Sequence, residues 1–393
     1  MSYQQSIFPD HLKHLLEDTA EPAVSLHLPM ERRGPEVRKN PIELKNALRE
    51  ARSLLEQRGT SPEVVARCLD RAEALVDDND FWEHQNASLA LFLGPDTFRP
   101  FVLHVPVERR VTVGSRFTVL PLLAELDQTT RAHVLALSEK AVCFYTWERG
   151  QLTPVEVEDL PPDLETALQL DPEQSLQGHI AANPGGSPAP VESFHGQGGG
   201  KDQRVAYQRE FFQKVDAAIA KHLHGDRAPL ILATVKESFH AYERINSHPR
   251  LSDFFLEGSY AQQDQATLAT DLEAELQRSH ENRVREDFAK AREIAGEGLA
   301  TEDPAEVARA AMEGRLDRLF VTWPPPAVSG RWEEARFTAE IDPSPNPQHD
   351  DMLDLAAAET WRRGGEVHAV PAALWQGDHA SLGQLRWKDG ARG

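Results

Sequence analysis

Hydrophobic and polar residues alternate along the first third of the chain in patterns typical of strands and helices. Residues 23–28 alternate apolar and polar side chains, which predicts a half-buried strand that ends at Pro29. Asn40 and Pro41 begin a helical pattern of leucines, since proline suits the first turn of a helix. Further apolar runs predict strands at 87–93, 101–105 and 111–119. We predict an N-terminal α/β domain over residues 1–127.

The middle of the chain combines a predicted strand meander with one long helix. The predicted strands are 132–138, 141–147, 151–157 and 229–235. From Asp202 the pattern is helical, and its predicted buried stripe comprises Val205, Phe212, Val215, Ile219 and Leu223. Residues 158–202 collect Pro, Gly, Gln and Ser, and predict a flexible loop because such a composition cannot bury enough apolar surface. We place the central domain at residues 128–273.

The last third of the chain alternates helices and strands with short connections. Helices are predicted at 275–295, 304–312 and 353–363, and strands at 318–323, 366–370 and 384–387. Residues 324–350 look like a proline-rich insertion. The alternation predicts a small α/β/α domain over residues 274–393. The predicted fold class is therefore α/β in three domains.

Composition narrows the class of protein. A chain of 393 residues with 40% hydrophobic residues predicts several cores. The net charge of −21 argues against non-specific coating of nucleic acid, although one basic face is compatible with it. Two cysteines, no secretory signal and no apolar run of membrane-spanning length predict a cytoplasmic protein without disulfides or membrane contact.

The most unusual stretch is glycine-rich and precedes the long helix. It comprises Phe194, His195, Gly196, Gln197, Gly198, Gly199, Gly200, Lys201 and Asp202. Glycines at this density permit a flexible tip or a close approach of the backbone to another molecule. A surface loop with incidental glycines is the alternative.

A nucleotide-binding loop is excluded by residue count. A Walker loop needs glycine where His195 stands and a hydroxyl residue where Asp202 stands. The dinucleotide fingerprint fails because Lys201 occupies the place of its third glycine. We therefore expect no nucleotide cofactor.

Other candidate chemistry has a simpler interpretation. His222, His224 and Asp226 lie at a helix end with spacings that point to different faces, so solvated residues are expected and no metal. The chain has no Gly-x-Ser-x-Gly elbow for a nucleophilic serine. The paired carboxylates 333–334 and 350–351 are expected to be solvated charge.

The glycine-rich stretch, the helix that follows it and the apolar strand 229–235 resemble the central domain of archaeal and eukaryotic class 1 peptide-chain release factors. The bacterial relatives of these factors, in the lineage of Pelota and the hibernation factor Balon, are the most similar group. Residues 24–29 and 40–50 resemble their N-terminal segment. The resemblance implies an RNase H-like central domain and a ribosomal-protein-like C-terminal domain.

In that family a His-Gly-Arg-Gly-Gly-Gln loop enters the peptidyl-transferase centre of the ribosome. His195 and Gly196 match its first two residues, Gln197 takes the place of arginine, and Gly198 and Gly199 match the paired glycines. Gly200 stands where the family has the glutamine that helps to position water for ester hydrolysis. The resemblance therefore implies loop insertion without release-factor-type hydrolysis.

The expected function is a ribosome-associated translation factor in rescue, hibernation or stress. The loop 195–201 would bind the ribosome or tRNA, and the following helix would contact RNA through Arg204, Arg209 and Lys214. Expected partners are rRNA, with tRNA and a translation GTPase at the C-terminal domain as further options. The alternatives are a peptidyl-tRNA hydrolase that uses Gln197 or His195, and a non-catalytic interaction scaffold.

Overall fold

The protein divides into two compact units, each described here by itself. The computed structural model describes residues 9–18, 20–32, 34–83, 85–128, 131–148, 150–169, 199–226, 228–262, 264–344, 346 and 349–388. Unit 1 combines residues 1–129 with 278–393, and unit 2 comprises residues 130–277. The chain therefore leaves unit 1, forms unit 2, and returns to unit 1.

The N-terminal part of unit 1 is an antiparallel sheet with the strand order β3-β2-β1-β4. Its strands are β1 (Ala23–Pro29), β2 (Ser88–Leu93), β3 (Phe98–Leu103) and β4 (Arg110–Gly114). The central strand β1 pairs Leu26 with Leu91 of β2 and with Val111 of β4. Each strand overlaps a predicted apolar run, but β3 begins three residues before the predicted residue 101, and β4 ends at Gly114, five residues before the end of the predicted strand 111–119.

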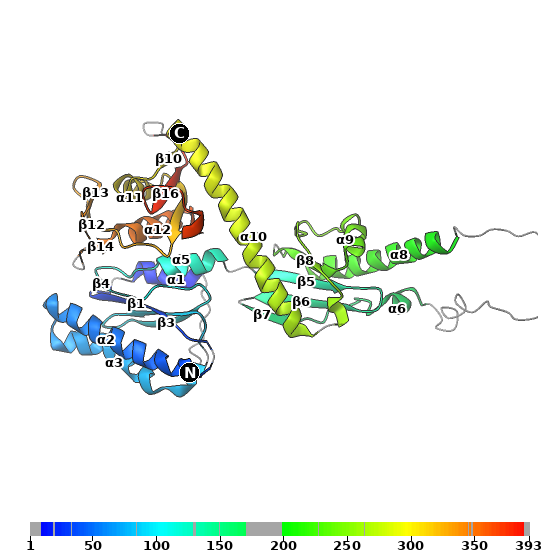
Figure 1. The fold of residues 1–393 in the computed structure, drawn as a ribbon, viewed down its shortest axis with the longest axis horizontal. Helices are drawn as coiled ribbons and strands as arrows, with labels where there is room; N and C mark the ends of the chain where they lie inside the picture. The colour runs from blue at the N-terminus through cyan, green and yellow to red at the C-terminus, as the bar shows by residue number, and fades with distance from the viewer. Residues whose placement is uncertain are drawn as a thin grey trace, which may run out of the picture. The chain divides into compact units, whose positions relative to one another are not determined.

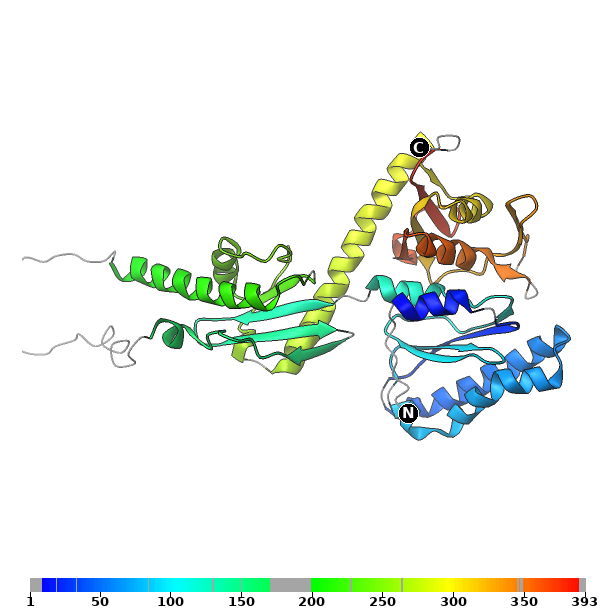
Figure 2. The same cartoon turned by 180° about the vertical axis from the view of Figure 1, so that it is seen from behind.

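Helices cover both faces of this sheet (Figure 1). The helices are α1 (Pro9–Glu17), α2 (Asn40–Gln57), α3 (Pro62–Ala74), α4 (Asn79–Glu83) and α5 (Leu120–Gln128), with the 3-10 turns η1 (Pro35–Lys39) and η2 (Leu75–Asp77). Side chains of β1 alternate, so that Val24, Leu26 and Leu28 pack with the cores of α2 and α3. The helices α1 and α5 lie against the opposite face (Figure 2).

The prediction that β1 is half-buried is wrong. All six residues before Pro29 are buried, including the polar Ser25 and His27. The alternation of apolar and polar residues correctly identified a strand, but the polar face is covered as well. Ser25 is satisfied there, since its hydroxyl accepts a hydrogen bond from the backbone N–H of Thr118 at 2.9 Å.

The C-terminal part of unit 1 is an α/β/α sandwich. Its sheet has the order β10-β16-β11-β15, with β11 and β15 parallel and β16 antiparallel to β11. The elements are α10 (Gln265–Glu293), η5 (Ile294–Glu297), β10 (Ala300–Thr301), α11 (Pro304–Met312), β11 (Leu316–Trp323), α12 (Met352–Arg362), β15 (Glu366–Pro371), η6 (Ala372–Leu374) and β16 (Ser381–Leu385). Leu319 of β11 faces α11 and α12, whereas Phe320 faces Phe288 of α10.

The predicted proline-rich insertion contains a second, small sheet. Strands β12 (Ser329–Glu333), β13 (Thr338–Ile341) and β14 (Asp350–Asp351) pair in the order β13-β12-β14. Ala339 of β13 packs with Met352 and Leu355 of α12. Prolines at the ends of the segment concealed a short hairpin whose inward-facing side chains cover the outer side of α12.

One apolar cluster joins the two parts of unit 1. Leu12, Phe92, Phe101 and Leu123 from the N-terminal part share it with the C-terminal residues Ala310, Leu319, Leu353 and Val367. All of these side chains are buried. Because burial of apolar area is the main stabilising term in folding, residues 9–128 and 278–388 depend on each other for one core.

Unit 2 is built on a mixed sheet with the order β7-β6-β5-β8-β9. Its elements are β5 (Ala132–Leu137), β6 (Val142–Glu148), β7 (Gln151–Pro154), α6 (Leu164–Leu168), α8 (Gly199–His222), β8 (Leu230–Thr234), α9 (Lys236–Glu243), β9 (Leu256–Glu257) and η4 (Tyr260–Gln262). The strands β5, β6 and β7 form the predicted antiparallel meander, and β8 joins parallel to β5. Helices α8 and α9 share a core with one face, and the first turns of α10 share one with the other.

The predicted loop 158–202 is partly helical where the structure describes it. Asp163 caps the short helix α6, because its carboxylate accepts a hydrogen bond from the backbone N–H of Thr166 at 2.7 Å. The helix α8 begins at Gly199, three residues before the predicted start. Residues 170–198 lie outside the described residues.

The fold class predicted from the sequence, α/β with several sheets and helices, is confirmed. The domain boundaries after residues 127 and 273 stay a prediction. The structure shows two compact units, and the chain passes between them after residues 129 and 277. In the described part of the chain, no helix is long and apolar enough to cross a membrane.

Candidate functional site

The structure describes only the last part of the predicted loop. His195, Gly196, Gln197 and Gly198 lie outside the described residues. Gly199, Gly200 and Lys201 form the first turn of α8. The position where release factors have their glutamine is therefore helical here, and Gly200 provides a backbone N–H but no side-chain amide. The first four N–H groups of a helix have no partner within the helix, so this end offers hydrogen-bond donors.

The helix α8 is anchored by its later turns. Phe211, Phe212, Val215 and Ile219 are fully buried and pack against α9 and the sheet. The prediction that Val205 belongs to this buried stripe is wrong, since its side chain is 60% exposed. Residues 203–206 are all exposed. The first turns of α8 therefore project beyond the core of unit 2, as Figure 1 also shows.

Two of the three cations predicted to contact RNA on α8 lie in surface ion pairs. The Arg204 guanidinium lies 3.0 Å from the Glu139 carboxylate. Lys214 forms an ion pair of 3.4 Å with Glu210 and donates a hydrogen bond to the Ala167 carbonyl oxygen at 2.7 Å. Arg209 has no ion-pair partner within the described residues. The role of these three side chains in RNA contact stays a proposal.

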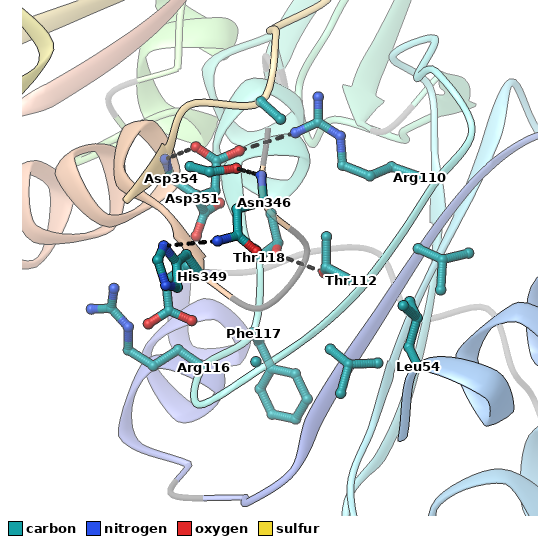
Figure 3. A pocket seen from close by; sticks show the side chains of 16 residues that line it. Leu54, Arg110, Thr112, Arg116, Phe117, Thr118, Asn346, His349, Asp351 and Asp354 are labelled. Carbon is teal, nitrogen blue, oxygen red and sulfur yellow. Dashed lines mark hydrogen bonds and ion pairs between the residues drawn. The ribbon is translucent and has the colours of Figure 1, made fainter. Parts of the chain in front are cut away.

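A second polar region lies within unit 1, between β4 and the small sheet (Figure 3). A cavity of about 230 Å³ opens there. Its lining includes Arg110, Arg116, Thr118, Asn346, His349 and Asp354. The Arg110 guanidinium lies 3.1 Å from the Asp351 carboxylate and donates to the Pro325 carbonyl oxygen at 2.6 Å. This arginine thus ties the N-terminal sheet to the C-terminal part at two points.

The prediction that carboxylates 350–351 are solvated is wrong for Asp351. Its carboxylate caps α12, accepting hydrogen bonds from the backbone N–H groups of Leu353 at 3.0 Å and Asp354 at 3.4 Å. Burial raises the pKa of Asp351, while the Arg110 guanidinium opposes the rise. The acidic residue directly before an apolar helical run was a capping signal that the sequence offered.

Asp354 forms a further tie across the same region. Its carboxylate accepts a hydrogen bond from the backbone N–H of Leu120, at the start of α5, at 2.6 Å. Burial, together with the nearby Asp351 carboxylate, raises the pKa of Asp354 to about 7. No sequence signal distinguished this aspartate, because its burial comes from the packing of α12 on the N-terminal part.

Most of the polar groups around this cavity already form structural contacts. His349 pairs with Asp342 at 2.6 Å and lies beside Asn346, and the hydroxyls of Thr112 and Thr118 lie 2.9 Å apart. Within the described ranges, no three His, Cys, Asp or Glu side chains gather in a way that could hold a metal ion. The region therefore holds the two parts of unit 1 together and presents no recognisable catalytic set.

The residues considered for metal binding at the end of α8 are not one cluster. His222 packs edge-on against Phe144, and His224 is exposed. Asp226 forms ion pairs with Arg131 at 3.0 Å and His133 at 3.1 Å. The expectation of solvated residues is wrong for Asp226, which ties the end of α8 to the start of β5.

The structure thus consists of mixed α/β units, and the glycine-rich segment precedes the long helix α8 in the sequence. Residues 132–315 match the family described as "Bacterial archaeo-eukaryotic release factor family 3". The match includes α8 and β8, the two segments of the central domain at which the sequence resembles release factors. The predicted resemblance to bacterial relatives of these factors is thereby confirmed for this range, and for residues 24–50 it stays a prediction.

Several solved structures are also similar to this chain. They include an archaeal translation termination factor, aRF1 (16% identity, 97% of this chain and 99% of that chain, TM-score 0.23), Dom34 of S. cerevisiae (11%, 77% and 74%, TM-score 0.36) and Pelota of Archaeoglobus fulgidus (11%, 77% and 80%, TM-score 0.31). At such low TM-scores these similarities decide neither fold nor function. A search of curated proteins finds no match.

Proposed function

We propose that this protein is a ribosome-associated translation factor that acts in rescue, hibernation or stress. The family match over residues 132–315 is the observation that supports it most directly. The protein would act in the cytoplasm, and its C-terminal part would contact a translation GTPase.

The glycine-rich segment would reach the peptidyl-transferase centre at the end of α8. Two features support this role. The segment 194–198 leads directly into the projecting first turns of the helix. The later turns are held rigidly, because Phe211, Phe212 and Val215 are completely buried. A rigid helix with an exposed end suits the delivery of a small-residue tip into a crowded site.

Peptide release would be absent or very weak. The family's glutamine positions water for ester hydrolysis, and Gly200 has no side chain for that task. Gly200 also lies within the first helical turn, where the backbone is already constrained. The loop would therefore occupy the site without completing the hydrolytic chemistry.

Co-sedimentation with ribosomes from growing and starved cells tests the proposal. The wild-type chain should appear in the ribosomal fraction, and a variant with His195→Ala and Gln197→Ala should bind more weakly. Absence of the wild-type protein from ribosomes in both conditions would contradict the proposal. Incubation with ribosomes that carry peptidyl-tRNA gives the second readout. If the wild type releases peptide above background, and Gln197→Ala or His195→Ala abolishes that release, the hydrolase is favoured instead.

A further inference from the structure

The outer face of α2 presents a row of cations at helical spacing. Arg38 at the end of η1, then Lys45 and Arg49 of α2, lie four to seven residues apart, with Ile42 between them. All four side chains are exposed, and Ile42 is 58% exposed. At 1.5 Å per residue the row extends over about 16 Å. We call Arg38, Ile42, Lys45 and Arg49 the α2 outer row.

The opposite face of the same helix fixes this row in place. Leu44, Leu48, Ala51 and Leu55 of α2 are buried against the N-terminal sheet. Helices α2 and α3 lie together on the face of the sheet away from α1 and α5 (Figure 2). The outer row is therefore a rigid surface that the core of unit 1 does not use.

The cations of the row are electrostatically available. Within the described residues, none of Arg38, Lys45 and Arg49 has a carboxylate partner at ion-pair distance. The contrast with α8 is clear, because Arg204 and Lys214 are paired there with Glu139 and Glu210. An unpaired surface cation retains its full charge for a partner.

Nearby acidic residues of α2 are occupied by another arginine. Arg109 lies 2.7 Å from the Glu50 carboxylate and 3.7 Å from that of Glu43. The exposed carboxylates Glu31 and Glu36 remain close in the sequence, and the exposed cations Arg32 and Lys39 flank them. The surface around the row thus has an excess of positive charge in a chain whose net charge is −21.

We propose that the α2 outer row binds RNA, with its three cations on successive phosphates and Ile42 against a ribose or base. The inference rests on the proposed ribosomal function and names a surface that this function would use. Two of the cations are arginines, whose planar guanidinium groups match phosphate oxygens in pairs. The acidic remainder of the surface repels RNA, so the protein binds in one orientation.

A membrane or an acidic peptide fits this row less well than RNA. A membrane-binding helix needs a broad exposed apolar face, and the apolar face of α2 is buried in the core. An acidic peptide would satisfy the charges but would give no reason for the similarity to translation factors. It remains an outcome of the experiment.

Binding of the full chain to purified ribosomal RNA over a series of salt concentrations tests the inference. The variant Arg38→Gln/Lys45→Gln/Arg49→Gln is compared with the matched triple Arg204→Gln/Arg209→Gln/Lys214→Gln on α8. Three phosphate contacts on single-stranded RNA contribute about 2 to the slope of log K against log salt. We expect the α2 triple to lose that slope, with affinity about 100-fold lower at 0.1 M salt, and the α8 triple to lose less than one third as much.

The results separate this inference from the proposed function. Equal losses for the two triples, or no loss for the α2 triple, would overturn the role of the row. Competition by poly-glutamate as strong as by RNA would overturn it in favour of an acidic peptide. The wild type could bind free ribosomal RNA, and the α2 triple lose that binding, while the wild type does not co-sediment with ribosomes. This result would support the role of the row and contradict the ribosomal function. If the α2 triple co-sediments with ribosomes as the wild type does, the ribosomal function would be supported and the role of the row contradicted.

Discussion

The helix α8 carries more lysines and arginines than α2, but more of them lie in ion pairs. On α8, Arg204 and Lys214 are held by Glu139 and Glu210. On α2, Glu43 and Glu50 pair with Arg109. Within the described residues, Lys45 and Arg49 of the row have no carboxylate partner, and Arg49 donates a hydrogen bond to the Asn46 side-chain oxygen at 3.3 Å. Counting lysines and arginines along a helix therefore does not measure its attraction for a polyanion, because the neighbours in the fold decide it.

The largest expected effect is a difference in the free energy of unfolding between substitutions on the inner and on the outer faces of α2 and α8. Leu48→Ala in α2 and Phe212→Ala in α8 each remove a buried side chain and should lower the free energy of unfolding by about 3–5 kcal/mol. Ile42→Ser and Val205→Ser, on the outer faces, should change it by less than about 0.5 kcal/mol. Denaturant unfolding of the four variants measures this, and a large loss for Val205→Ser would place that residue in the core after all.

The two units should also differ in their response to pH. The folded-state pKa of Asp354 in unit 1, about 7, lies above its ordinary value of 3.8. The folded state therefore holds this proton more tightly, and the stability it contributes is complete below pH 4 and lost as pH rises through 7. Asp226 in unit 2 behaves oppositely, because a hydrogen bond from the Ala228 backbone lowers its pKa.

The variant Asp354→Asn tests this difference, since the amide oxygen still accepts from Leu120 but carries no charge. We expect Asp354→Asn to gain stability over the wild type by a few kcal/mol between pH 5 and pH 8. Thermal unfolding at both pH values measures it. If the difference in stability between Asp354→Asn and the wild type is the same at pH 5 and pH 8, Asp354 does not titrate in this range.

Arg109→Gln should weaken RNA binding by the α2 outer row, although Arg109 is not part of the row. The substitution releases Glu43 and Glu50, which then lower the positive potential of the row. RNA affinity at 0.1 M salt should fall by about tenfold. Arg52→Gln is the matched control, because Arg52 pairs with Glu73 of α3 instead. Equal losses for Arg109→Gln and Arg52→Gln would remove the special role of Arg109.

The smallest expected effect is a gain on α8. Glu139→Gln removes the carboxylate that neutralises Arg204 while its amide oxygen can still accept a hydrogen bond. One additional available cation should raise RNA affinity by about fivefold at 0.1 M salt. An unchanged affinity would show that α8 does not approach RNA at all, and would widen the contrast with α2.

The order of elements in this fold could be predicted from the sequence because strand and helix periodicities are local properties. The starts of β1, α2 and β8 agree with the structure to within a residue. Burial could not be predicted equally well, since it depends on distant segments. Val205 continues the helical pattern of α8 beyond the end of the core, and the polar face of β1 is covered by residues that come much later in the chain.

The predicted site divides in the same way. The glycine-rich motif and its family resemblance are visible in consecutive residues, and the family match confirms the resemblance. The ties of Asp351 to Arg110 and of Asp354 to Leu120 join residues that are more than 200 positions apart. The pairing of Arg109 with α2 is likewise a property of the folded sheet. No pattern in a single sequence shows such contacts.

The shared core of unit 1 has a consequence for how the protein folds during its synthesis on the ribosome. Its N-terminal part cannot complete the apolar cluster that contains Leu12 and Leu123 until residues beyond Arg278 have been synthesised. At about 5–20 residues per second, the roughly 150 intervening residues impose a delay of about 8–30 s. During that interval a nascent chain would expose apolar side chains of α1 and α5 that the C-terminal part later covers, and we expect it to need a chaperone at this stage of translation.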